Sequence, residues 1–488
     1  QARFADFAVR TLEAPGRLGA FLEEYPVLAR LLVATLERWL QSSLELLTRV
    51  AEDREQLGAV LDGGRAPGAL VSVRTGAGDL HRGGRSVVLL TFGSGLRVVY
   101  KPRSLEIEAR YQELLGWLEQ GGLRHPHRRL KVLMREGYGW VEHVETGGCD
   151  TREAVERFYW RQGSHLALLY LLRAVDFHYG NLLAAGEHPV LVDLEGLFHH
   201  RPSLGDGDTA MHRAALVLDQ SVLSIGLLPT LFFGREGRAG VDLSGLGGEA
   251  GQLYPHASAT VEDRAQDTMR VVHRQMATSG AHNRALLHGK PVDVTEFVNS
   301  IVDGFRETYL HLCRHREEVA RMLRDFHDVE VRHIARATMR YGFLLQESLH
   351  PDFLHDALDR DQALDKLWAE VRVRPSLGRL APSEHEDLRL GDVPVFSARP
   401  GERHVWDSQG RCVPDYFQRA SLEDSLQLLA ALGPEGCDAQ VALIRQSMVA
   451  IDKERESATR TSPEAAASLP PPATAEACLA GAVQLGEY

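Results

Sequence analysis

The stretch DFHYGNLLAAGEHPVLVDLEG, residues 176–196, constrains the fold more than any other part of the sequence. Asp176, His178 and Asn181 stand close together ahead of two short apolar runs, which the turn-forming GEHP separates. The second run ends at Asp193. A hairpin of this length returns the chain beside Asn181, so the side-chain oxygens of Asn181 and Asp193 can share one hard cation such as Mg²⁺. The pattern therefore predicts a polar loop and a hairpin that frame a metal–nucleotide site.

A strand-end lysine upstream supplies the cation that such a site needs. SVVLLTF and LRVVYK are strand-like runs joined by GSG, and Lys101 ends the second run. A lysine in this position can reach the α- and β-phosphates of ATP, as it does in protein kinases. Asp176 can orient and deprotonate an incoming hydroxyl. The carboxylate partner of Lys101 stays open between Glu106, Glu108 and Glu113, all on the helix expected next.

These signals are specific only as a set. Alone, a strand-end lysine is usually a solvated edge charge, and DxHxxN is usually a turn with side-chain capping. Their order and separations favour a kinase-like site, and DxHxxN followed by a strand-end Asp resembles the catalytic loop of lipid kinases more than HRDxxxxN does. The sequence has no GxxxxGK[ST] motif, which argues against a P-loop NTPase.

Composition limits the classes of function. The chain has 488 residues, 44% hydrophobic and 25% charged, which is typical of a globular protein. A net charge of −12 and a pI near 6 argue against a general nucleic-acid-binding protein. No apolar run approaches the ~18 residues of a transmembrane helix. Five cysteines without a CxxC pair predict a reduced, cytoplasmic protein.

Periodicity divides the chain into five predicted regions within an α+β fold class. We expect a bilobal arrangement like that of lipid kinases, with a small mixed-β lobe, a helical lobe and large helical additions. Residues from about 200 to 380 are expected to be mostly helical. Both ends interrupt helical patterns, so we expect an excerpt of a longer protein. The regions are a helical segment (1–62), the β lobe with its Gly-rich loop and lysine strand (63–150), the helical lobe (151–380), an accessory region (381–455), and an Ala/Ser/Pro-rich linker that leads into a further domain (456–488).

Arginines recur every fourth residue at Arg332, Arg336 and Arg340. On one helix they would form a basic face that can hold a phosphate. The alternative is a solvated basic stripe that pairs with the acidic LRDFHDVE just before it.

Several runs together resemble the dehydratase domain of the class II lanthipeptide synthetases, the LanM family, a DUF4135-like domain. They are VVYKPRSLEIEARYQELLGWL, GYGWVEHV, FYWRQGSHLALLYLLRAVDFHYGNLLAAGEHPVLVDLEGLF, SVLSIGLLP, VDLSGLG, VRHIARATMRYGFLLQESLHPDFL and EDLRLGDVPVF. The resemblance spans about residues 20–450. It implies an enzyme that phosphorylates Ser and Thr of a ribosomally made precursor peptide with ATP and Mg²⁺. It then eliminates phosphate, which leaves dehydroalanine or dehydrobutyrine.

The resemblance also implies roles for individual residues. Because a departing phosphate needs cationic stabilisation and a proton carrier, an arginine and a histidine suit the elimination step. The residue that removes the Cα proton stays open, with Lys101 as one alternative. By motif, Lys101, Asp176, His178, Asn181 and Asp193 serve phosphorylation, whereas Arg332 and Thr338 of RHIARAT, with Asp79 and His81 of GDLHRGGR, serve elimination.

The placement of Arg332 and Thr338 depends on where a helix begins. On one continuous helix the two side chains would point roughly 120° apart. They converge only if the helix begins after Arg332, or if Arg332 reaches around it.

Other positions depart from the family or stay ambiguous. Gly180 stands where the family leads us to expect an acidic residue, and Glu195 is either a second metal ligand or a surface strand residue. The LanC-like cyclase domain expected in the full-length protein needs a zinc site of Cys and His. The only candidate cluster is His311, Cys313 and His315, where a helix would turn the cysteine away from both histidines, so we expect no metal there.

Three functions remain open from the sequence. The first is the bifunctional kinase and lyase, the second a plain Ser/Thr peptide kinase, and the third an inactive scaffold that binds the precursor leader. The residues assigned to elimination argue against the second, and those assigned to phosphorylation argue against the third. The sequence identifies neither the precursor, nor the leader-binding site, nor the oligomeric state.

Overall fold

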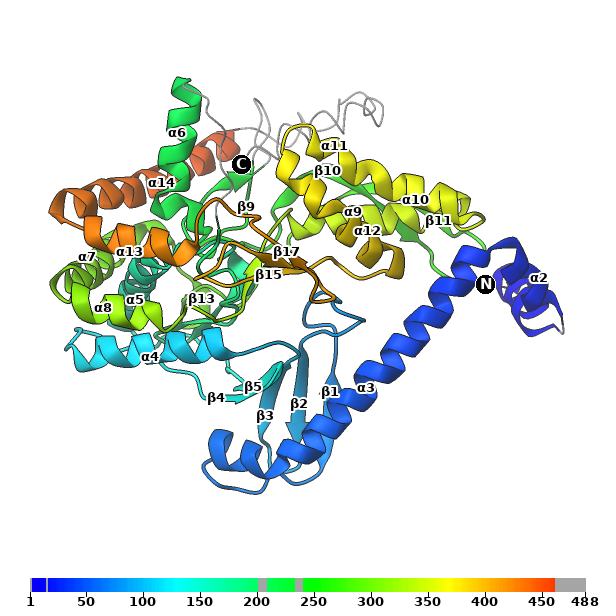
Figure 1. Ribbon diagram of the computed structural model, residues 1–488, viewed down its shortest axis with the longest axis horizontal. Coiled ribbons are helices and arrows are strands. Elements are labelled where there is room, and N and C mark those ends of the chain that lie inside the picture. Colours follow the sequence, from blue (N-terminus) through cyan, green and yellow to red (C-terminus); the bar gives the residue numbers. More distant parts are fainter. Residues whose placement is uncertain (1, 15, 201–208, 233–239, 461–488) are drawn as a thin grey trace.

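The computed structural model describes residues 2–14, 16–200, 209–232 and 240–460. Helices and several separate sheets occur together (Figure 1), in agreement with the mixed α+β class predicted from the sequence. The likeness to lipid kinases stays a prediction. Within these described parts, no helix is both long and apolar enough to cross a membrane.

A five-stranded antiparallel sheet carries Lys101. The strand Val88–Phe92 shows the alternation expected of a sheet with one buried face, because Val88, Leu90 and Phe92 are buried and the residues between them are only partly so. The predicted hairpin around the GSG turn is confirmed. In spatial order the strands are β1 (Leu70–Arg74), β2 (Val88–Phe92), β3 (Arg97–Lys101), β5 (Tyr138–Glu142) and β4 (Val132–Arg135).

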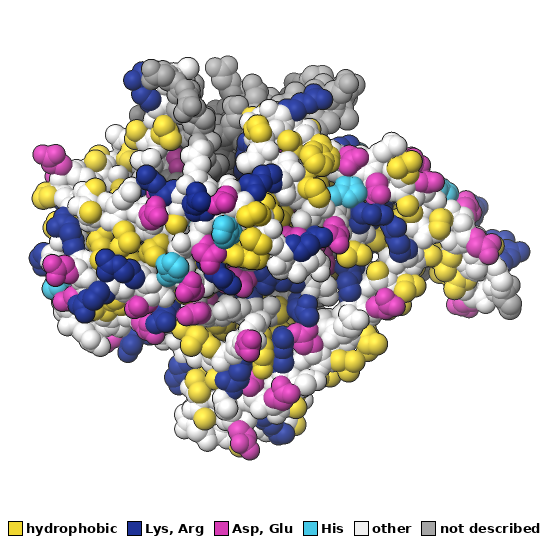
Figure 2. All heavy atoms as spheres, in the orientation of Figure 1, with side chains coloured by type: hydrophobic (Ala, Val, Ile, Leu, Met, Phe, Trp, Pro, Cys, Tyr) yellow, Lys and Arg dark blue, Asp and Glu magenta, His cyan; other side chains and the backbone are white. Residues whose placement is uncertain are grey.

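The long helix α3 (Pro26–Leu61) covers the apolar face of this sheet with its C-terminal half. A buried carboxylate fixes the contact, since Asp53 accepts hydrogen bonds from the Trp140 indole at 2.7 Å and the Tyr138 hydroxyl at 3.0 Å. The N-terminal half forms an arm with exposed apolar side chains such as Leu36 and Trp39 (Figures 1 and 2). Two short helices precede it, α1 (Ala2–Ala8) and α2 (Arg17–Glu24).

The helical body is built around α5 (Arg152–Leu171), which is buried on all sides from Phe158 onward. It crosses α7 (Val298–Arg314) at two glycines, Gly163 and Gly304. A Cβ atom on Gly163 would lie 1.8 Å from the Ile301 carbonyl oxygen, and one on Gly304 would lie 1.8 Å from that of Trp160. Only glycine lets the two backbones approach this closely. Around this pair lie α4 (Glu106–Gln120), α8 (Arg316–Arg324), α13 (Ser421–Ala431) and α14 (Pro434–Arg460).

The expectation of a mostly helical segment from about 200 to 380 is wrong for its middle part. That part contains β-hairpins, and in the longest the β-branched Thr260 and Val261 pair with Val272 and Val271, residue types that favour strands. In the described part of this segment, α6 (Ala210–Asp219) and a short 3₁₀ helix (Val222–Ile225) precede them. The paired strands are β8 (Leu231–Phe232) with β9 (Val241–Asp242), β10 (Leu253–Glu262) with β11 (Arg270–Ala277), and β12 (Leu286–Leu287) with β13 (Lys290–Pro291).

A second, four-stranded sheet lies beside a group of short helices. Its first strand carries Arg332 and pairs with a strand far downstream in the sequence. The strands are β14 (Val331–His333), β15 (Phe396–Ala398), β16 (Val405–Trp406) and β17 (Cys412–Val413), and the helices are α9 (Thr338–Ser348), α10 (Ala357–Leu364), α11 (Trp368–Val371) and α12 (Ala381–Leu390).

The linker predicted from residue 456 begins inside a helix, because α14 continues to Arg460. The rest of that predicted region, residues 461–488, lies outside the described residues.

Replacing Gly163 with alanine tests the close crossing of α5 and α7. The added methyl group would meet backbone, which cannot rotate away, so we expect a loss of about 3 kcal/mol in the free energy of unfolding and a lower melting temperature. Gly342→Ala in α9 is the matched control, since open space surrounds that position and alanine favours a helix by about 1 kcal/mol. Equal melting temperatures for the two variants would contradict the crossing.

Candidate active site

The loop from Asp176 to Asn181 has an unusual backbone. Asp176 has a φ of 68°, in the left-handed region that non-glycine residues rarely occupy and that Asp tolerates better than most. The Asn181 side-chain NH₂ donates to the Asp176 carbonyl oxygen at 2.8 Å, which leaves the amide oxygen of Asn181 for a cation. His178 Nε2 lies 4.0 Å from a carboxylate oxygen of Asp176. These three predicted residues therefore share one turn, and strain in such a turn is typical of functional sites.

The position that departs from the family, Gly180, faces the His178 ring. The Gly180 N–H donates to His178 Nδ1 at 3.0 Å. A Cβ atom at residue 180 would approach the ring to 2.9 Å, so a larger residue would require the imidazole to move.

Two segments hold this loop from either side. The Phe177 N–H donates to the Ile225 carbonyl at 2.9 Å, within SVLSIGLLP, and the Tyr179 N–H donates to the Leu243 carbonyl at 3.1 Å, within VDLSGLG. Asn283, fully buried, donates to the carbonyls of both Gly245 and Gly247 at 2.9 Å. The sequence identified these two motifs only by resemblance, and the structure gives them a physical role as clamps on the loop.

The structure resolves the carboxylate partner of Lys101. Its ammonium group is buried and donates to Glu108 Oε1 at 3.1 Å and to the Val192 carbonyl at 2.6 Å. The other two candidates, Glu106 and Glu113, instead pair with Arg110 on the surface of α4.

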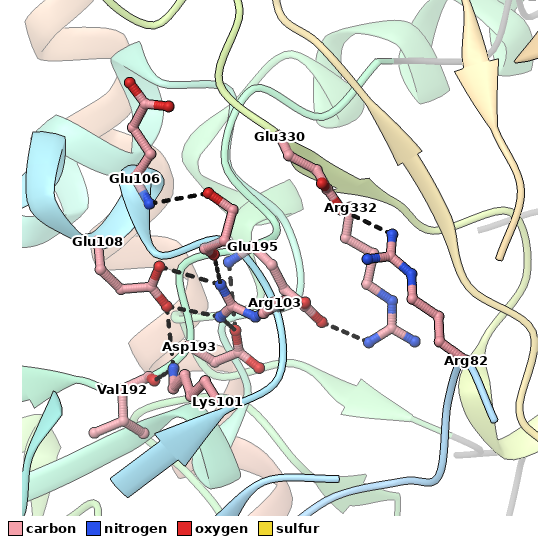
Figure 3. A network of polar contacts seen from close by, with 11 residues as sticks. Arg82, Lys101, Arg103, Glu106, Glu108, Val192, Asp193, Glu195, Glu330 and Arg332 are labelled. Atoms are coloured by element: carbon pink, nitrogen blue, oxygen red, sulfur yellow. Dashed lines mark hydrogen bonds and ion pairs between the residues drawn. The ribbon is translucent and has the colours of Figure 1, made fainter. Parts of the chain in front are cut away.

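Arg103, which the sequence analysis missed, lies at the centre of the site (Figure 3). Its guanidinium forms two hydrogen bonds with Glu108, at 2.7 and 3.1 Å, and contacts Asp193 Oδ1 at 3.1 Å and Glu195 Oε2 at 3.2 Å. Burial alone would lower the pKa of Arg103, but Glu108, Glu195 and Asp193 raise it above its ordinary value. The sequence signal that could have identified Arg103 was its position in KPRS, two residues after Lys101.

Glu195 joins this cluster to Arg332. The Arg332 guanidinium donates to Glu195 Oε1 at 2.6 Å, and the Arg332 backbone N–H donates to the Glu195 carbonyl at 2.8 Å. Burial would raise the pKa of Glu195, but Arg332 and Arg103 lower it to about 2. Glu195 is not a surface strand residue, since it lies in a turn and each of its carboxylate oxygens contacts an arginine, whereas its role as a second metal ligand stays a prediction.

The prediction of one basic helical face is wrong. Arg332 lies in β14, Arg336 in the connection that follows and Arg340 in α9, because the helix begins only at Thr338. Arg336 is buried against Glu384 and Glu370, and Arg340 also contacts Glu370. The alternative pairing with LRDFHDVE is wrong as well. However, the late helix start meets the condition under which Arg332 and Thr338 can converge, although no hydrogen bond joins these two described side chains.

The Gly-rich loop reaches the same cluster through His81. His81 Nδ1 lies 2.7 Å from the Val393 carbonyl and donates to it. Burial lowers the pKa of His81, and the charge of Arg332 lowers it further. Asp392 fixes the loop by accepting from the Gly83 N–H at 2.7 Å. Asp79 is exposed on the loop.

Asn181 and Asp193 flank the predicted hairpin of β6 (Leu182–Ala185) and β7 (His188–Leu191), which is confirmed. The Val192 N–H donates to the Asn181 carbonyl at 3.1 Å, so the hairpin returns the chain to Asn181 as predicted. Among the described residues no three His, Cys, Asp or Glu side chains cluster to hold a metal alone, the HLCRH group included. A Mg²⁺ held by Asn181 and Asp193 would therefore draw further ligands from phosphates and water.

Replacing Asn283 with alanine tests the clamp on the loop. The carbonyls of Gly245 and Gly247 would lose their donor, at a cost of about 1–3 kcal/mol. We expect faster hydrogen exchange at the Tyr179 amide, which bonds to this clamp, than at the Phe177 amide, which bonds to the other. Asn299→Ala, at an exposed position, is the control. Unchanged exchange at Tyr179 would contradict the clamp.

Comparison with known proteins identifies a family and a relative that resemble this chain in sequence. A family model described as "Domain of unknown function (DUF4135)" matches residues 25–399. The chain is also 25% identical over 389 residues to the lacticin 481/lactococcin biosynthesis protein LcnDR2 of Lactococcus lactis subsp. lactis, an alignment that covers 76% of this chain. The chain spans 40% of the length of that curated relative. The family resemblance predicted from the motifs is thereby confirmed.

Proposed function

Because this chain belongs to the DUF4135 family, we propose that it acts as the dehydratase of a class II lanthipeptide synthetase. In this proposal it phosphorylates Ser and Thr of a ribosomally made precursor peptide with ATP and Mg²⁺, and then eliminates the phosphate. The observation that carries the proposal is the continuous ion network from Lys101 through Glu108, Arg103 and Glu195 to Arg332, which joins the residues of both steps.

The phosphorylation step rests on Asp176 and Lys101. Burial raises the pKa of Asp176, and His178 and Arg332 lower it in part, so the carboxylate is a stronger base than an ordinary Asp. It takes the proton of the Ser or Thr hydroxyl, whose oxygen forms a bond to the γ-phosphorus of ATP while ADP leaves. Lys101, held by Glu108, binds the phosphates. Mg²⁺ at Asn181 and Asp193 would neutralise phosphate charge.

The elimination step rests on Arg332 and His81. A base removes the Cα proton, the electron pair forms the Cα=Cβ bond, and the Cβ–O bond breaks as phosphate leaves with its electrons. Arg332 stabilises the charge on the leaving phosphate. The lowered pKa of His81 keeps its imidazole neutral near pH 7, so it can carry a proton. Thr338 and Asp79 belong to this step by family motif alone.

The arrangement of the elements supports a bilobal fold like that of lipid kinases as part of this proposal. The five-stranded sheet, whose strand β3 carries Lys101, and the helices around α5 form two separate parts of the fold (Figure 1). We further propose that the chain works in the cytoplasm and that the full-length protein carries a LanC-like cyclase domain. The share of its relative that this chain spans leaves room for such a domain.

Mass spectrometry of Ser/Thr-rich lanthipeptide precursors, incubated with the chain, ATP and Mg²⁺, tests the two steps. We expect the wild type to remove water, 18 Da per residue, and Arg332→Ala to accumulate phosphorylated peptide, because the leaving phosphate loses its cation. Arg340→Ala is the control, since Arg340 is of similar exposure and pairs with Glu370 outside the site. A wild type that stops at phosphopeptide would establish the plain kinase instead.

Thermal stabilisation by ATP and Mg²⁺ separates the enzyme from a scaffold. We expect a higher melting temperature with nucleotide at about 100 times its dissociation constant, equivalent to about 2.7 kcal/mol. Lys101→Met should abolish this effect yet still fold, because Glu108 keeps its two hydrogen bonds to Arg103. No stabilisation of the wild type, together with no change in precursor mass, would favour the inactive scaffold.

A further inference from the structure

The carboxylate of Glu195 lies between two arginine side chains (Figure 3). Its Oε1 atom is 2.6 Å from Arg332 NH1, and its Oε2 atom is 3.2 Å from Arg103 Nε. All three side chains are largely buried, with 15–20% of each exposed. Glu195 thus places one oxygen on each guanidinium.

Two guanidinium groups around one anion form an arrangement that also suits phosphate. Arginine presents planar donors that match the oxygens of carboxylates and phosphates alike. A phosphate monoester carries about −1.5 to −2 charges at pH 7 and has three acceptor oxygens, whereas a carboxylate carries one charge and has two. A phosphate that enters this position therefore competes well with Glu195.

The backbone allows such an exchange without a change of fold. The backbone of Arg332 stays in place because its N–H donates to the Glu195 carbonyl and its strand pairs with β15. Arg103 stays in place because Glu108 binds it through both carboxylate oxygens. Glu195 itself lies in the connection after β7, outside any helix or strand. Only its side chain must move.

We propose that Glu195 is an internal substitute for phosphate, whose carboxylate fills a phosphomonoester site between Arg103 and Arg332 until a phosphoserine or phosphothreonine displaces it. This inference rests on the proposed function and adds Arg103 to the phosphate-binding residues. Free inorganic phosphate has the same chemistry and is the second source that the experiment must distinguish.

The experiment measures binding to Glu195→Gln by calorimetry, without ATP or precursor. Its two probes are inorganic phosphate and a short phosphoserine peptide, with the unphosphorylated peptide as reference. We expect both phosphate probes to bind about tenfold more tightly than to wild type, because the competing charge is gone. Glu370→Gln is the matched control, since Glu370 also bridges two arginines, Arg336 and Arg340, at similar exposure, and should leave binding unchanged.

Adding Arg103→Met to Glu195→Gln should remove the gain. A folded Glu195→Gln protein that binds phosphate no more tightly than wild type would overturn the proposal, because Glu195 would then serve only to hold the arginines. Tighter binding of inorganic phosphate alone would overturn the assignment to phosphopeptide. If Glu195→Gln fails to fold, phosphate binding is measured with Arg103→Met and with Arg332→Met instead. Loss of phosphate binding in both variants supports the two-arginine site. Retained binding in either variant overturns it.

This outcome is separate from that of the proposed function. Phosphate binding is measured without turnover, so it can succeed even if no precursor is modified. Conversely, a chain that dehydrates precursors but shows no effect of Glu195→Gln on phosphate binding would keep its function and lose only this inference.

Discussion

The contacts of Arg103 with three carboxylates are the interaction on which the site depends. Charges this deeply buried are tolerated only when they are paired, and removing one partner leaves another uncompensated. Arg103 follows β3, Glu108 lies in α4, Asp193 and Glu195 follow β7, and Glu195 in turn contacts Arg332 in β14. One guanidinium therefore joins the segment after β3 to α4 and to the segment after β7, and Glu195 extends these contacts to β14. Its pairing decides where Lys101 and Arg332 can point.

A second constraint keeps the Asp176 loop in a conformation that it would not hold alone. The left-handed backbone at Asp176 is unfavourable for a residue with a side chain and persists only when its surroundings determine it. The segments around Ile225 and Leu243 hold the loop in this conformation through backbone hydrogen bonds. Asn283 stiffens the segment around Leu243. The clamps therefore fix the backbone from which Asp176 and His178 present their half-exposed side chains.

Local signals in the sequence predicted the parts of the site that depend on neighbours in the chain. Alternating apolar residues and turn residues were sufficient to predict β2, β3 and the β6–β7 hairpin. They therefore also predicted where Lys101, Asn181 and Asp193 lie at the ends of these strands. The choice of Glu108 over Glu106 and Glu113 depends on which side of α4 faces β3, which no local pattern encodes. The strand of Arg332 is three residues long and pairs with β15 far downstream, so its arginine spacing wrongly predicted a helix. Arg103 was overlooked because its partners come from distant segments.

The charges of the network also bear on how one site would serve the two proposed steps. Lys101, Arg103 and Arg332 face Glu108, Asp193 and Glu195, so equal numbers of formal charges meet in a largely buried space. A phosphate added to this balanced set would introduce up to two uncompensated negative charges, which burial disfavours strongly. Departure of Glu195 leaves Arg103 paired with Glu108 and Asp193 and frees the guanidinium of Arg332 for a new anion. Withdrawal of Glu195 would let the same arginines that organise the free site receive the phosphate, so the electrostatics that stabilise the fold would also favour elimination.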